Sequence, residues 1–394
     1  MITVDTDQNQ ARVLHIGKYF PPDPGGMETY LRDLMASCGN MGTQCAALVH
    51  QSRIGLQSIE EHFQERGITL HITRVATWFR LLFTPISPTF PFALAGLIKQ
   101  CQPCILHFHL PNPSAFWGLL LPSARKLPWV IHWQSDVLTP KSNWLIRLCY
   151  VAYQPLESAM LKRASKIITT SNQYLSSSEA LAPFREKCCV IPLGITDRFG
   201  DYRPEEDAMM PHKPLKILAI GRLAHYKGFD VLLRAISRTE NTELDIVGDG
   251  KLLRSLKLLA RSLKLTTRVR FHGAVTDQAR DELVLACDCL CLPSIDRTES
   301  FGIVLLEAMS AGKACVISDV PGSGVTSVVE ADQTGLHVPP GDHIALAEAV
   351  QRLGKDRDLL LAMGRRGREK FVDALTIEVS TRGVLAVYND LRSA

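Results

Sequence analysis

The stretch that decides the fold is CDCLCLPSIDRTESFGIVLLEAM, residues 287–309. Its opening run, Cys287 to Leu292, is apolar apart from one aspartate and predicts a buried strand, in which free cysteine behaves as a small hydrophobe. The apolar residues further on predict a helix that begins near Phe301 or Gly302. A buried strand, a connecting loop and a helix in this order form half of a βαβ unit, from which parallel sheets are built.

The same alternation of short apolar runs and longer helical patterns extends along the whole chain, which predicts the α/β class. The pattern runs through the first half and starts again after residue 214, so we expect two doubly wound parallel sheets. The strands expected in the first half are Val13 to Ile16, Ala46 to Val49, Ile105 to His109, Trp129 to Trp133, Lys166 to Thr170 and Cys189 to Ile191. Those expected in the second half are Lys216 to Ile220, Glu243 to Val247, Val269 to Phe271, Cys287 to Leu292 and Ala314 to Ile317.

Length and composition agree with two domains. With 394 residues, 46% of them hydrophobic, the chain can bury two cores of ordinary size. Thr196 to Pro214 carries three prolines and no helical or strand period, which is typical of an interdomain linker. We therefore place a first domain at residues 1–197, a linker at 198–214 and a second domain at 215–370. Ligands of doubly wound sheets bind beyond the carboxyl ends of the strands, so we expect the ligand site at the turns from strand to helix.

Charge is distributed unevenly between the halves. Residues 1–200 hold 18 Lys and Arg against 13 Asp and Glu, whereas residues 201–394 hold 26 against 27. This imbalance is too small to indicate nucleic acid, and no stripe of interleaved aromatic and basic residues supports that partner. The more basic first half leaves open an anionic membrane surface or a phosphate-bearing acceptor.

The cysteines, the N-terminal residues and the apolar segments indicate the cellular compartment. Eleven cysteines occur without a paired metal spacing, and Cys101 and Cys104 have no second C-x-x-C at zinc-site distance. The polar, acidic N-terminal residues do not resemble an export leader. No stretch reaches the roughly 20 apolar residues that a membrane-spanning helix needs. We therefore expect a reduced, cytoplasmic protein.

The strongest chemical signal is ESFGIVLLE, residues 299–307, in which two glutamates bracket the expected helix start. The free amides and the positive dipole end of a helix bind phosphate, and Gly302 would let the backbone approach a ligand closely. Glu307 could accept hydrogen bonds from a ribose. Either glutamate alone would more often be a helix-start acid or a solvated side chain. Their arrangement directly after a buried strand favours a nucleotide site.

These residues resemble family four of the retaining glycosyltransferases (glycosyl transferases group 1), whose signature has seven residues between two glutamates in a setting like E-S-F-G-I-V-L-L-E-A-M. The resemblance implies the GT-B fold, in which two Rossmann-like domains face a central cleft, with a terminal helix at about 371–394 crossing back to the first domain. It also implies that Glu299 contacts the transferred sugar and that Glu307 holds the ribose. The diphosphate would lie on the amides of Phe301, Gly302, Ile303 and Val304.

A second segment, GRLAHYKGFD at residues 221–230, is similar to the family's G-R-L-x-x-x-K-G element. Arg222 and Lys227 follow an expected strand and can clamp a diphosphate while neutralising charge on the leaving group. Solvated surface cations are the alternative. The strand-end position and the flanking glycines favour the clamp.

Three other loops carry weaker signals. Gly248 follows an expected strand, but a G-x-G alone is weak evidence. Val275 lies in a loop that resembles the one with which the family meets the base, mostly through backbone atoms. Gly25 and Gly26 resemble the family's glycine pair and could present amides to a phosphate or sugar, although a simple turn is an equal alternative. No dinucleotide-binding G-x-G-x-x-G occurs at this first turn.

Two strand ends in the first half carry histidines. HFHLPNP at 107–113 and IHWQSDV at 131–137 look like segments of bacterial mannosyltransferase-like members of the family. His109 and His132 could bind hydroxyls or exchange protons, although a core position is more common for any single histidine. Where many relatives have the histidine of W-H-S-D, this chain has Gln134, which can hydrogen-bond a hydroxyl but cannot act as a base. Altered acceptor choice or reduced activity is therefore an alternative.

The resemblance implies a retaining hexosyltransferase that needs no metal and no cofactor besides a GDP- or UDP-linked sugar donor. We expect transfer of mannose from GDP-mannose to a glycan or lipid-linked acceptor in polysaccharide or O-antigen biosynthesis. The alternatives are a UDP-sugar transferase for glucose or GlcNAc, a catalytically weak sugar-nucleotide-binding scaffold, and a sugar-nucleotide epimerase of the same architecture.

Two apolar clusters, Trp78 to Phe83 and Phe92 to Ile98, are separated by prolines that exclude one continuous helix. Arg74, Arg80 and Lys99 flank them. One interpretation is peripheral contact with an anionic bilayer, at the cytoplasmic face of the inner membrane. The other is that these residues pack the core of the first domain.

Overall fold

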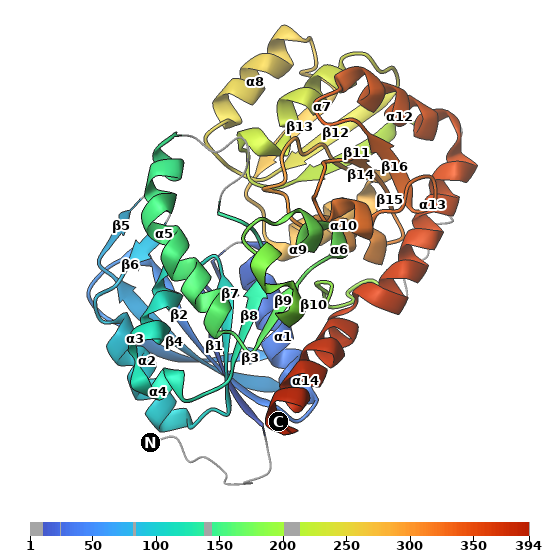
Figure 1. The fold of residues 1–394 in the computed structure, drawn as a ribbon. Helices are drawn as coiled ribbons and strands as arrows, with labels where there is room; N and C mark the ends of the chain where they lie inside the picture. The colour runs from blue at the N-terminus through green and yellow to red at the C-terminus, as the bar shows by residue number, and fades with distance from the viewer. Residues whose placement is uncertain (1–10, 24, 82–83, 138–143, 201–212, 394) are drawn as a thin grey trace. The chain divides into compact units, whose positions relative to one another are not determined.

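The computed structural model describes residues 11–23, 25–81, 84–137, 144–200 and 213–393 (Figure 1). The chain divides into two compact units. Unit 1 comprises Met1–Thr170, Ser178–Leu193 and Ile377–Ala394, and unit 2 comprises Ser171–Ser177 and Gly194–Thr376. Most of the predicted linker at 198–214 lies outside the described residues.

Unit 1 is built on an eight-stranded sheet in the order β10-β9-β8-β7-β1-β2-β4-β3. Its neighbouring strands are parallel except for β3 and β4. The strands are β1 Arg12–Ile16, β2 Gln44–Ile54, β3 Ile59–Glu65, β4 Ile68–Thr77, β7 Ile105–Leu110, β8 Trp129–Trp133, β9 Lys166–Thr169 and β10 Cys188–Val190. A separate hairpin consists of β5 Phe79–Leu81 and β6 Thr84–Ile86.

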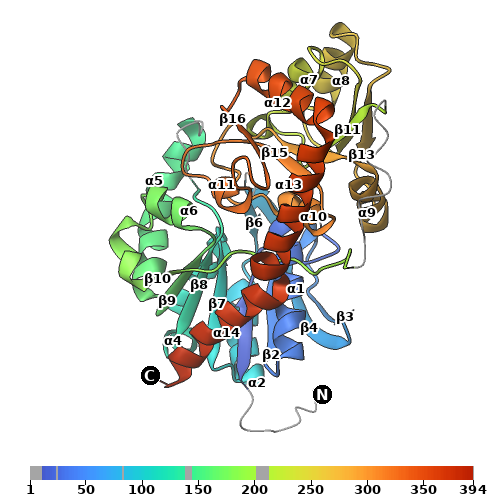
Figure 2. The same ribbon diagram turned by 90° about the vertical axis from the view of Figure 1, so that its right-hand side faces the viewer.

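The helices of unit 1 include one from the far end of the chain. They are α1 Gly26–Asn40, α2 Phe90–Cys101, α3 Trp117–Leu120, α4 Pro122–Arg125, α5 Trp144–Arg163 and α14 Ile377–Ser393. Helix α14 lies beside α1 (Figure 2), where the hydroxyls of Ser380 and Tyr30 are 3.0 Å apart. Ser380 also donates a hydrogen bond to the carbonyl oxygen of Pro192. The last helix is therefore part of the core of unit 1.

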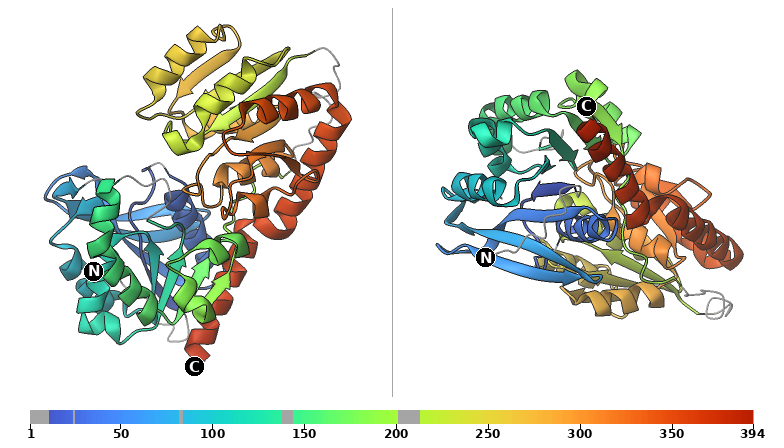
Figure 3. Two further views of the ribbon diagram at one scale, coloured as in Figure 1. Left: turned by 45° about the horizontal axis from the view of Figure 1, so that its top comes forward. Right: turned by 90° about the horizontal axis from the view of Figure 1, so that it is seen from below.

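Unit 2 contains a six-stranded, all-parallel sheet in the order β13-β12-β11-β14-β15-β16, with helices on both sides of the strands (Figure 3). The strands are β11 Leu215–Ile220, β12 Thr242–Val247, β13 Val269–Gly273, β14 Cys289–Leu292, β15 Ala314–Ser318 and β16 Gly335–Val338. The helices are α6 Asn172–Ser177, α7 Phe229–Ile236, α8 Leu253–Ser262, α9 Asp277–Ala286, α10 Ile303–Ser310, α11 Val325–Val328, α12 His343–Lys355 and α13 Arg357–Lys370. This strand order is that of a doubly wound nucleotide-binding sheet, with its switch point between β11 and β14.

The predicted α/β class with two doubly wound parallel sheets is confirmed. All eleven expected strands are present, with small shifts at their ends. One such shift concerns Cys287, which caps the end of α9 instead of opening β14. Strands β3, β4, β5, β6 and β16 were not predicted.

The predicted terminal helix at about 371–394 is not continuous. Phe371–Leu375 forms a π-helical turn, and Thr376 is extended, with φ −76° and ψ 155°, before α14 begins at Ile377. The backbone of Ile195 pairs with Thr376, and the carboxylate of Asp197 receives two hydrogen bonds from Arg368. Residues 194–200 are thereby held within unit 2, whereas we expected 194–197 in the first domain and 198–200 in the linker.

The described residues also show the state of the cysteines and the hydropathy of the helices. All eleven cysteines lie in the described part of the chain and have free thiols. Across residues 11–393, apart from the gaps named above, no helix combines the length and the hydropathy that crossing a membrane requires.

Candidate active site

The switch point of the unit 2 sheet brings two predicted residues into direct contact. Strands β11 and β14 are neighbours, so the loops at their carboxyl ends meet. Lys227 follows β11 and Glu299 follows β14, and Lys227 Nζ forms an ion pair with Glu299 Oε2. Both side chains are buried. Burial alone would lower the pKa of Lys227, but the Glu299 carboxylate outweighs it and holds this pKa above its ordinary value, so the ammonium remains charged.

The Glu299 carboxylate and main chain are both held by serines. Ser294 Oγ donates to Glu299 Oε2 at 3.3 Å. Ser323 Oγ donates to the main-chain oxygen of Glu299. These contacts fix the acid at the end of β14 from two directions, so its position does not depend on Lys227 alone.

Glycine allows the two loops to approach each other. Gly228, directly after Lys227, has φ +66°, and a Cβ at this position would collide with the carbonyl group of Pro293. A side chain at this glycine would therefore separate the β11 loop from the end of β14. The glycine in the G-R-L-x-x-x-K-G element thus has a packing reason that is independent of any ligand.

Helix α10 begins one residue after the predicted start. Gly302 occupies its N-cap with φ +80° and ψ +60°, and no side chain caps the helix. The amide of Leu305 donates to the carbonyl oxygen of Gly302 at 2.8 Å, so the amides at the very start of the helix are the ones that an anion could engage. A Cβ on Gly302 would meet Leu292 and Leu305, so packing and positive φ both require glycine here. Phe301 is buried, and Ile303 and Val304 are half-buried.

Glu307 lies on α10 beside two arginines that the sequence analysis did not assign. Its Oε1 is 3.5 Å from Arg198 Nη2 and 3.5 Å from Arg280 Nε. Its Oε2 is buried and has no hydrogen-bond partner among the described residues. Burial raises the pKa of Glu307, and the two arginines offset this effect in part. The side chain thus presents one unpaired, buried acceptor atom, which a donor group of a ligand could satisfy.

The remaining candidates of unit 2 lie in neighbouring loops. Arg222 is exposed, unlike Lys227 in the same loop. Gly248 has φ +129°, and the carbonyl of Gly221 occupies the space that a Cβ would need. Its amide also donates to the carbonyl oxygen of Gly273 at 2.8 Å. Gly248 therefore joins the loops after β11, β12 and β13, while Val275 is half-buried just beyond β13.

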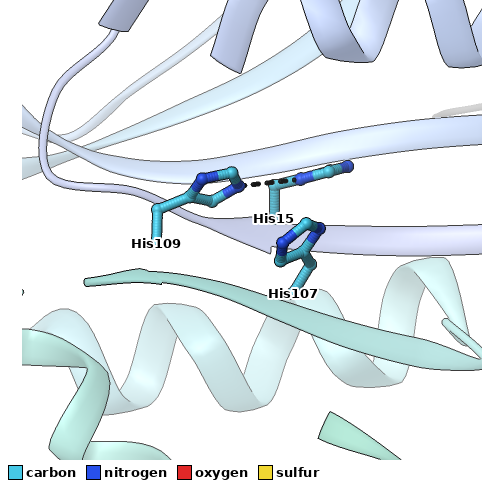
Figure 4. Close-up of side chains that lie close together, drawn as sticks. All are labelled: His15, His107 and His109. Atoms are coloured by element: carbon cyan, nitrogen blue, oxygen red, sulfur yellow. Dashed lines mark hydrogen bonds between the residues drawn. The ribbon is translucent and has the colours of Figure 1, made fainter. Parts of the chain in front are cut away.

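In unit 1, four histidines share one face of the sheet. The register places His15 on β1 opposite His107 on β7, and His109 on β7 opposite His132 on β8. All four are buried. Figure 4 shows the three nearest the switch point of this sheet, where His15 Nδ1 lies 3.1 Å from His109 Nε2. Gln134 follows β8, and its Nε2 is 3.3 Å from His109 Nδ1.

Burial changes what these histidines can do. It lowers the pKa of His132 to about 3. It also lowers the pKa of His109 well below the ordinary value, with His15 and His132 adding to the effect. Both rings are therefore neutral near pH 7, which favours hydrogen bonding over proton exchange. Gln134 Oε1 is buried without a partner among the described residues.

The predicted glycine pair stands at the start of α1. Gly25 is half-buried and Gly26 is exposed. The N-cap Gly25 has no side chain to cap α1, and the carboxylate of Glu28, in the first turn, lies against this glycine. Pro24, in the same loop, lies outside the described residues.

Two doubly wound units, one of which has a buried cation and two acids around a helix start, form the GT-B fold that glycosyltransferases use. Comparison with known families agrees along most of the chain. Residues 25–194 match the glycosyl transferase 4-like domain, and residues 205–370 match the glycosyl transferases group 1 domain. The chain belongs to the glycosyl transferases group 1 family.

Three relatives align over more than nine tenths of the chain. The O-antigen chain mannosyltransferase C of Escherichia coli is 26% identical and covers 96% of this chain and 98% of its own. The D-rhamnosyltransferase WbpZ of Pseudomonas aeruginosa is 28% identical over 93% of this chain and 92% of its own. A GDP-mannose-dependent alpha-(1-6)-phosphatidylinositol monomannoside mannosyltransferase of Mycobacterium tuberculosis is 27% identical over 91% and 93%.

Solved structures share the fold at lower identity. Sucrose-phosphate synthase from Thermosynechococcus elongatus superposes with a TM-score of 0.79 and 21% identity, covering 98% of this chain and 100% of its own. Anabaena HepE in complex with UDP-glucose gives a TM-score of 0.71 and 18% identity, covering 96% and 99%. At these identities the likeness shows the fold alone.

Proposed function

We propose that the chain is a retaining mannosyltransferase that transfers mannose from GDP-mannose to a glycan or lipid-linked acceptor of the O-antigen or lipopolysaccharide type. The buried ion pair between Lys227 and Glu299 at the end of β14 supports this most directly, because it provides a cation for a diphosphate and a carboxylate for a sugar in adjacent positions. The names of the mannosyl and rhamnosyl relatives support the sugar class and the acceptor class.

In the proposed reaction, the bond between the anomeric carbon and the phosphate oxygen breaks, and a bond from that carbon to the acceptor oxygen forms on the same face. The acceptor proton passes to the leaving diphosphate. The Lys227 ammonium, the first amides of α10 and the exposed Arg222 stabilise the negative charge that develops on the diphosphate. These groups carry the charge that a metal ion would otherwise neutralise, so we propose that transfer needs none. The Glu299 carboxylate stabilises positive character at the sugar.

Glu307 supplies a place for the nucleoside in this proposal. Its unpaired Oε2 can accept a hydrogen bond from a ribose hydroxyl, which would satisfy a buried atom that otherwise lacks a partner. Arg198 and Arg280 near Oε1 keep the carboxylate oriented, since both approach the same oxygen. Oε1 of Glu307 thus contacts the protein, and Oε2 is left for the ligand.

A panel of sugar nucleotides tests the donor. Selective binding raises the melting temperature by mass action, so GDP-mannose should shift the unfolding of the chain more than UDP-glucose, UDP-GlcNAc or ADP-glucose. A larger shift with UDP-glucose would instead favour a UDP-sugar transferase.

Turnover tests the rest of the proposal. Release of nucleoside diphosphate should depend on an acceptor and should continue in the presence of a chelator. Nuclear magnetic resonance should show a retained anomeric configuration in the product. Donor binding without release in the presence of any lipid-linked acceptor would favour the scaffold.

We also propose that unit 1 makes peripheral contact with an anionic membrane, at the cytoplasmic face if the acceptor is lipid-linked. Trp78, Phe79 and Leu81, at and beside β5, have exposed fractions of 43%, 52% and 62%. Arg80 lies between them, which suits an anionic surface. Leu82 and Phe83 lie outside the described residues.

The second apolar cluster, Phe92 to Ile98, agrees in part with membrane contact and in part with core packing. Phe92 is 77% exposed, whereas Leu94 and Leu97, two and five residues further along α2, are buried in the core. A comparable exposed face occurs on α5, where Trp144, Leu148 and Val151 lie at helical spacing. Exposed aromatic and aliphatic side chains on several elements of unit 1 support contact with a lipid surface.

A further inference from the structure

Three histidines of unit 1 place one ring nitrogen each within 4.8 Å of one another. They are His15 on β1 and His107 and His109 on β7, and all are buried (Figure 4). Adjacent parallel strands hold them at fixed positions, because His15 and His107 are register partners and His109 is two residues along on the same face. The group is therefore part of the rigid sheet and not of a loop.

One pair of nitrogens in this group lies close to the separation of neighbouring ligands of one metal ion. His15 Nδ1 and His109 Nε2 are 3.1 Å apart. A tetrahedral zinc ion with bonds to nitrogen of about 2.0–2.1 Å holds its ligand nitrogens about 3.3 Å apart. These two atoms are thus almost at the separation of neighbouring ligands, although a shared proton can also account for this contact.

One unpaired atom of the group, His107 Nε2, favours a ligand site over a satisfied hydrogen-bond network. His107 Nε2 and His15 Nε2 are buried and have no hydrogen-bond partner among the described residues. A buried ring nitrogen without a partner is unfavourable. A bound ion would engage His107 Nε2 directly, whereas the shared proton between His15 and His109 leaves it unsatisfied.

The remote nitrogens of two of these rings already have polar partners. Tyr388 Oη, from α14, lies 2.5 Å from His107 Nδ1. The side-chain amide of Gln134 lies 3.3 Å from His109 Nδ1. Rotation of the Gln134 amide by 180° would bring its unpaired Oε1 into the place of Nε2, where it can accept from His109. Metal-binding histidines nearly always donate their second N–H to such an outer partner.

We propose that His15 Nδ1, His107 Nε2 and His109 Nε2 bind one divalent transition-metal ion, with zinc as the reference ion and a water molecule as fourth ligand. Three imidazoles without a carboxylate suit zinc, copper, iron or nickel, and do not suit magnesium or calcium. The ion would tie β1 to β7 at the switch point of the unit 1 sheet and add to the stability of this unit. It takes no part in the transfer step proposed above, so either proposal can fail without the other.

Because the group is buried, the ion has to enter during folding. The full chain is unfolded in guanidinium with a chelator, desalted, and refolded either with one equivalent of zinc or with the chelator still present. We expect the zinc sample to retain about one ion per chain by mass spectrometry and to melt at a higher temperature. The variants His15→Gln and His107→Gln should retain less than about a tenth of that zinc, because each removes one ligand. His50→Gln, which alters a buried histidine on β2 that contacts Ser114 instead, should retain all of it.

Two further measurements separate this site from the cysteines and from a folding defect. Cobalt in the wild-type chain should give the visible bands of a tetrahedral nitrogen site, without an intense sulfur-to-cobalt band. Tyr388→Phe removes only the outer partner of His107 and should weaken zinc binding by about 10- to 100-fold. A refolded wild-type chain without zinc, equal zinc in the His15 and His107 variants, or a sulfur-to-cobalt band would each overturn the proposal.

Discussion

At the scale of single residues, the proposed reaction requires the buried pair of Lys227 and Glu299 to change partners when a donor binds. Removing one member of a buried pair costs about 3–5 kcal/mol, because the other charge remains without compensation. A diphosphate can replace the carboxylate as the partner of Lys227, which releases Glu299 toward the sugar. In the donor-free protein, the pair therefore keeps the Lys227 ammonium charged, ready for the diphosphate.

Glu299→Gln should abolish most sugar transfer while leaving donor binding intact. The amide keeps the shape and can still receive the hydrogen bond from Ser294, but it carries no charge to stabilise the sugar as the bond breaks. We expect the turnover number to fall by about 10²–10³-fold, the usual effect of losing one preorganised electrostatic group. Turnover and calorimetric donor affinity are measured together, with Glu282→Gln, an exposed acid on α9, as the control. Transfer within a few-fold of wild type would show that Glu299 has another role.

Lys227→Ala and Arg222→Ala should differ in size although both remove a cation from the same loop. Lys227 is buried and Arg222 is exposed, and a charge-assisted contact strengthens where water is excluded. We expect Lys227→Ala to weaken binding of the nucleoside diphosphate by at least about tenfold more than Arg222→Ala does. Titration calorimetry with the nucleoside diphosphate alone measures this. Equal affinities of the two variants would contradict the assignment of Lys227 to the diphosphate.

His50 should make unit 1 sensitive to acid. Burial, with a smaller effect from Lys18, lowers the pKa of His50 to about 4, whereas an unfolded histidine titrates near 6.5. Its contribution to stability is complete above pH 6.5 and is lost as the pH falls toward 4, by up to about 1.4 kcal/mol per pH unit. Denaturant unfolding of wild type and His50→Gln between pH 7 and 4 should show a flatter dependence in the variant. Parallel curves would mean that His50 titrates alike in the folded and unfolded chain.

The part of the site that could be predicted from sequence is local. A strand end, a glycine and a helix start are neighbours in the chain, so Lys227, Gly302 and Glu307 could be assigned from their motifs. Arg198 and Arg280 could not, because they reach Glu307 from segments that are distant in sequence. Only the tertiary fold brings them together, and Arg198 stood in a region whose composition predicted a linker.

At the scale of elements, the same distinction between local and distant signals applies to the fold. Central strands such as β7 and β8 are buried along their whole length and read as apolar runs. Strand β3 is an edge strand with charged and exposed residues, so its composition gives no such signal. Strand β4 does alternate apolar and polar residues, and its period of two could have identified it. Strand β16 reads GLHV, in which a glycine and a histidine interrupt the apolar residues, so it shows no apolar run.

The hairpin of β5 and β6 should bind anionic vesicles through its exposed apolar side chains. Replacing Trp78, Phe79 and Leu81 together by serine removes apolar area that could enter the interfacial layer. Because these side chains are exposed, the melting temperature should change little, as is usual for surface substitutions. Sedimentation with phosphatidylglycerol vesicles should fall several-fold relative to wild type, and salt should weaken what remains.

Two controls accompany the hairpin variant. Leu258→Ser removes an exposed leucine of similar accessibility from α8 of unit 2 and should leave sedimentation unchanged. Vesicles of phosphatidylcholine alone should bind both proteins weakly, since the charge is then missing. A marked fall in melting temperature with vesicle binding retained would show that the hairpin packs the core and does not contact lipid.

At the scale of the whole molecule, the last helix of the chain belongs to the same unit as the first strand. Unit 1 begins at the N-terminal strand but includes Ile377–Ala394, so all of unit 2 from Gly194 onward is inserted before the final helix. Thr376 marks the passage between the units, because the helical backbone is interrupted there. Unit 2 contains every strand of its sheet without α14, whereas unit 1 lacks part of its core until α14 is present.

Ending the chain after Thr376 should therefore unfold unit 1 and spare unit 2. Helix α14 buries Ile377, Val384, Val387 and Tyr388, and each large apolar side chain contributes about 1.5–3 kcal/mol. Their loss is of the order of the whole stability of a domain, about 5–15 kcal/mol. Calorimetry of the truncated chain should lack the transition of unit 1. Nucleoside diphosphate should raise the temperature of the remaining transition, because the proposed diphosphate site lies in unit 2. Removing only residues 391–394, which follow the last buried residue of α14, should preserve both transitions. If the chain truncated after Thr376 keeps both as well, α14 is an accessory helix and unit 1 folds without it.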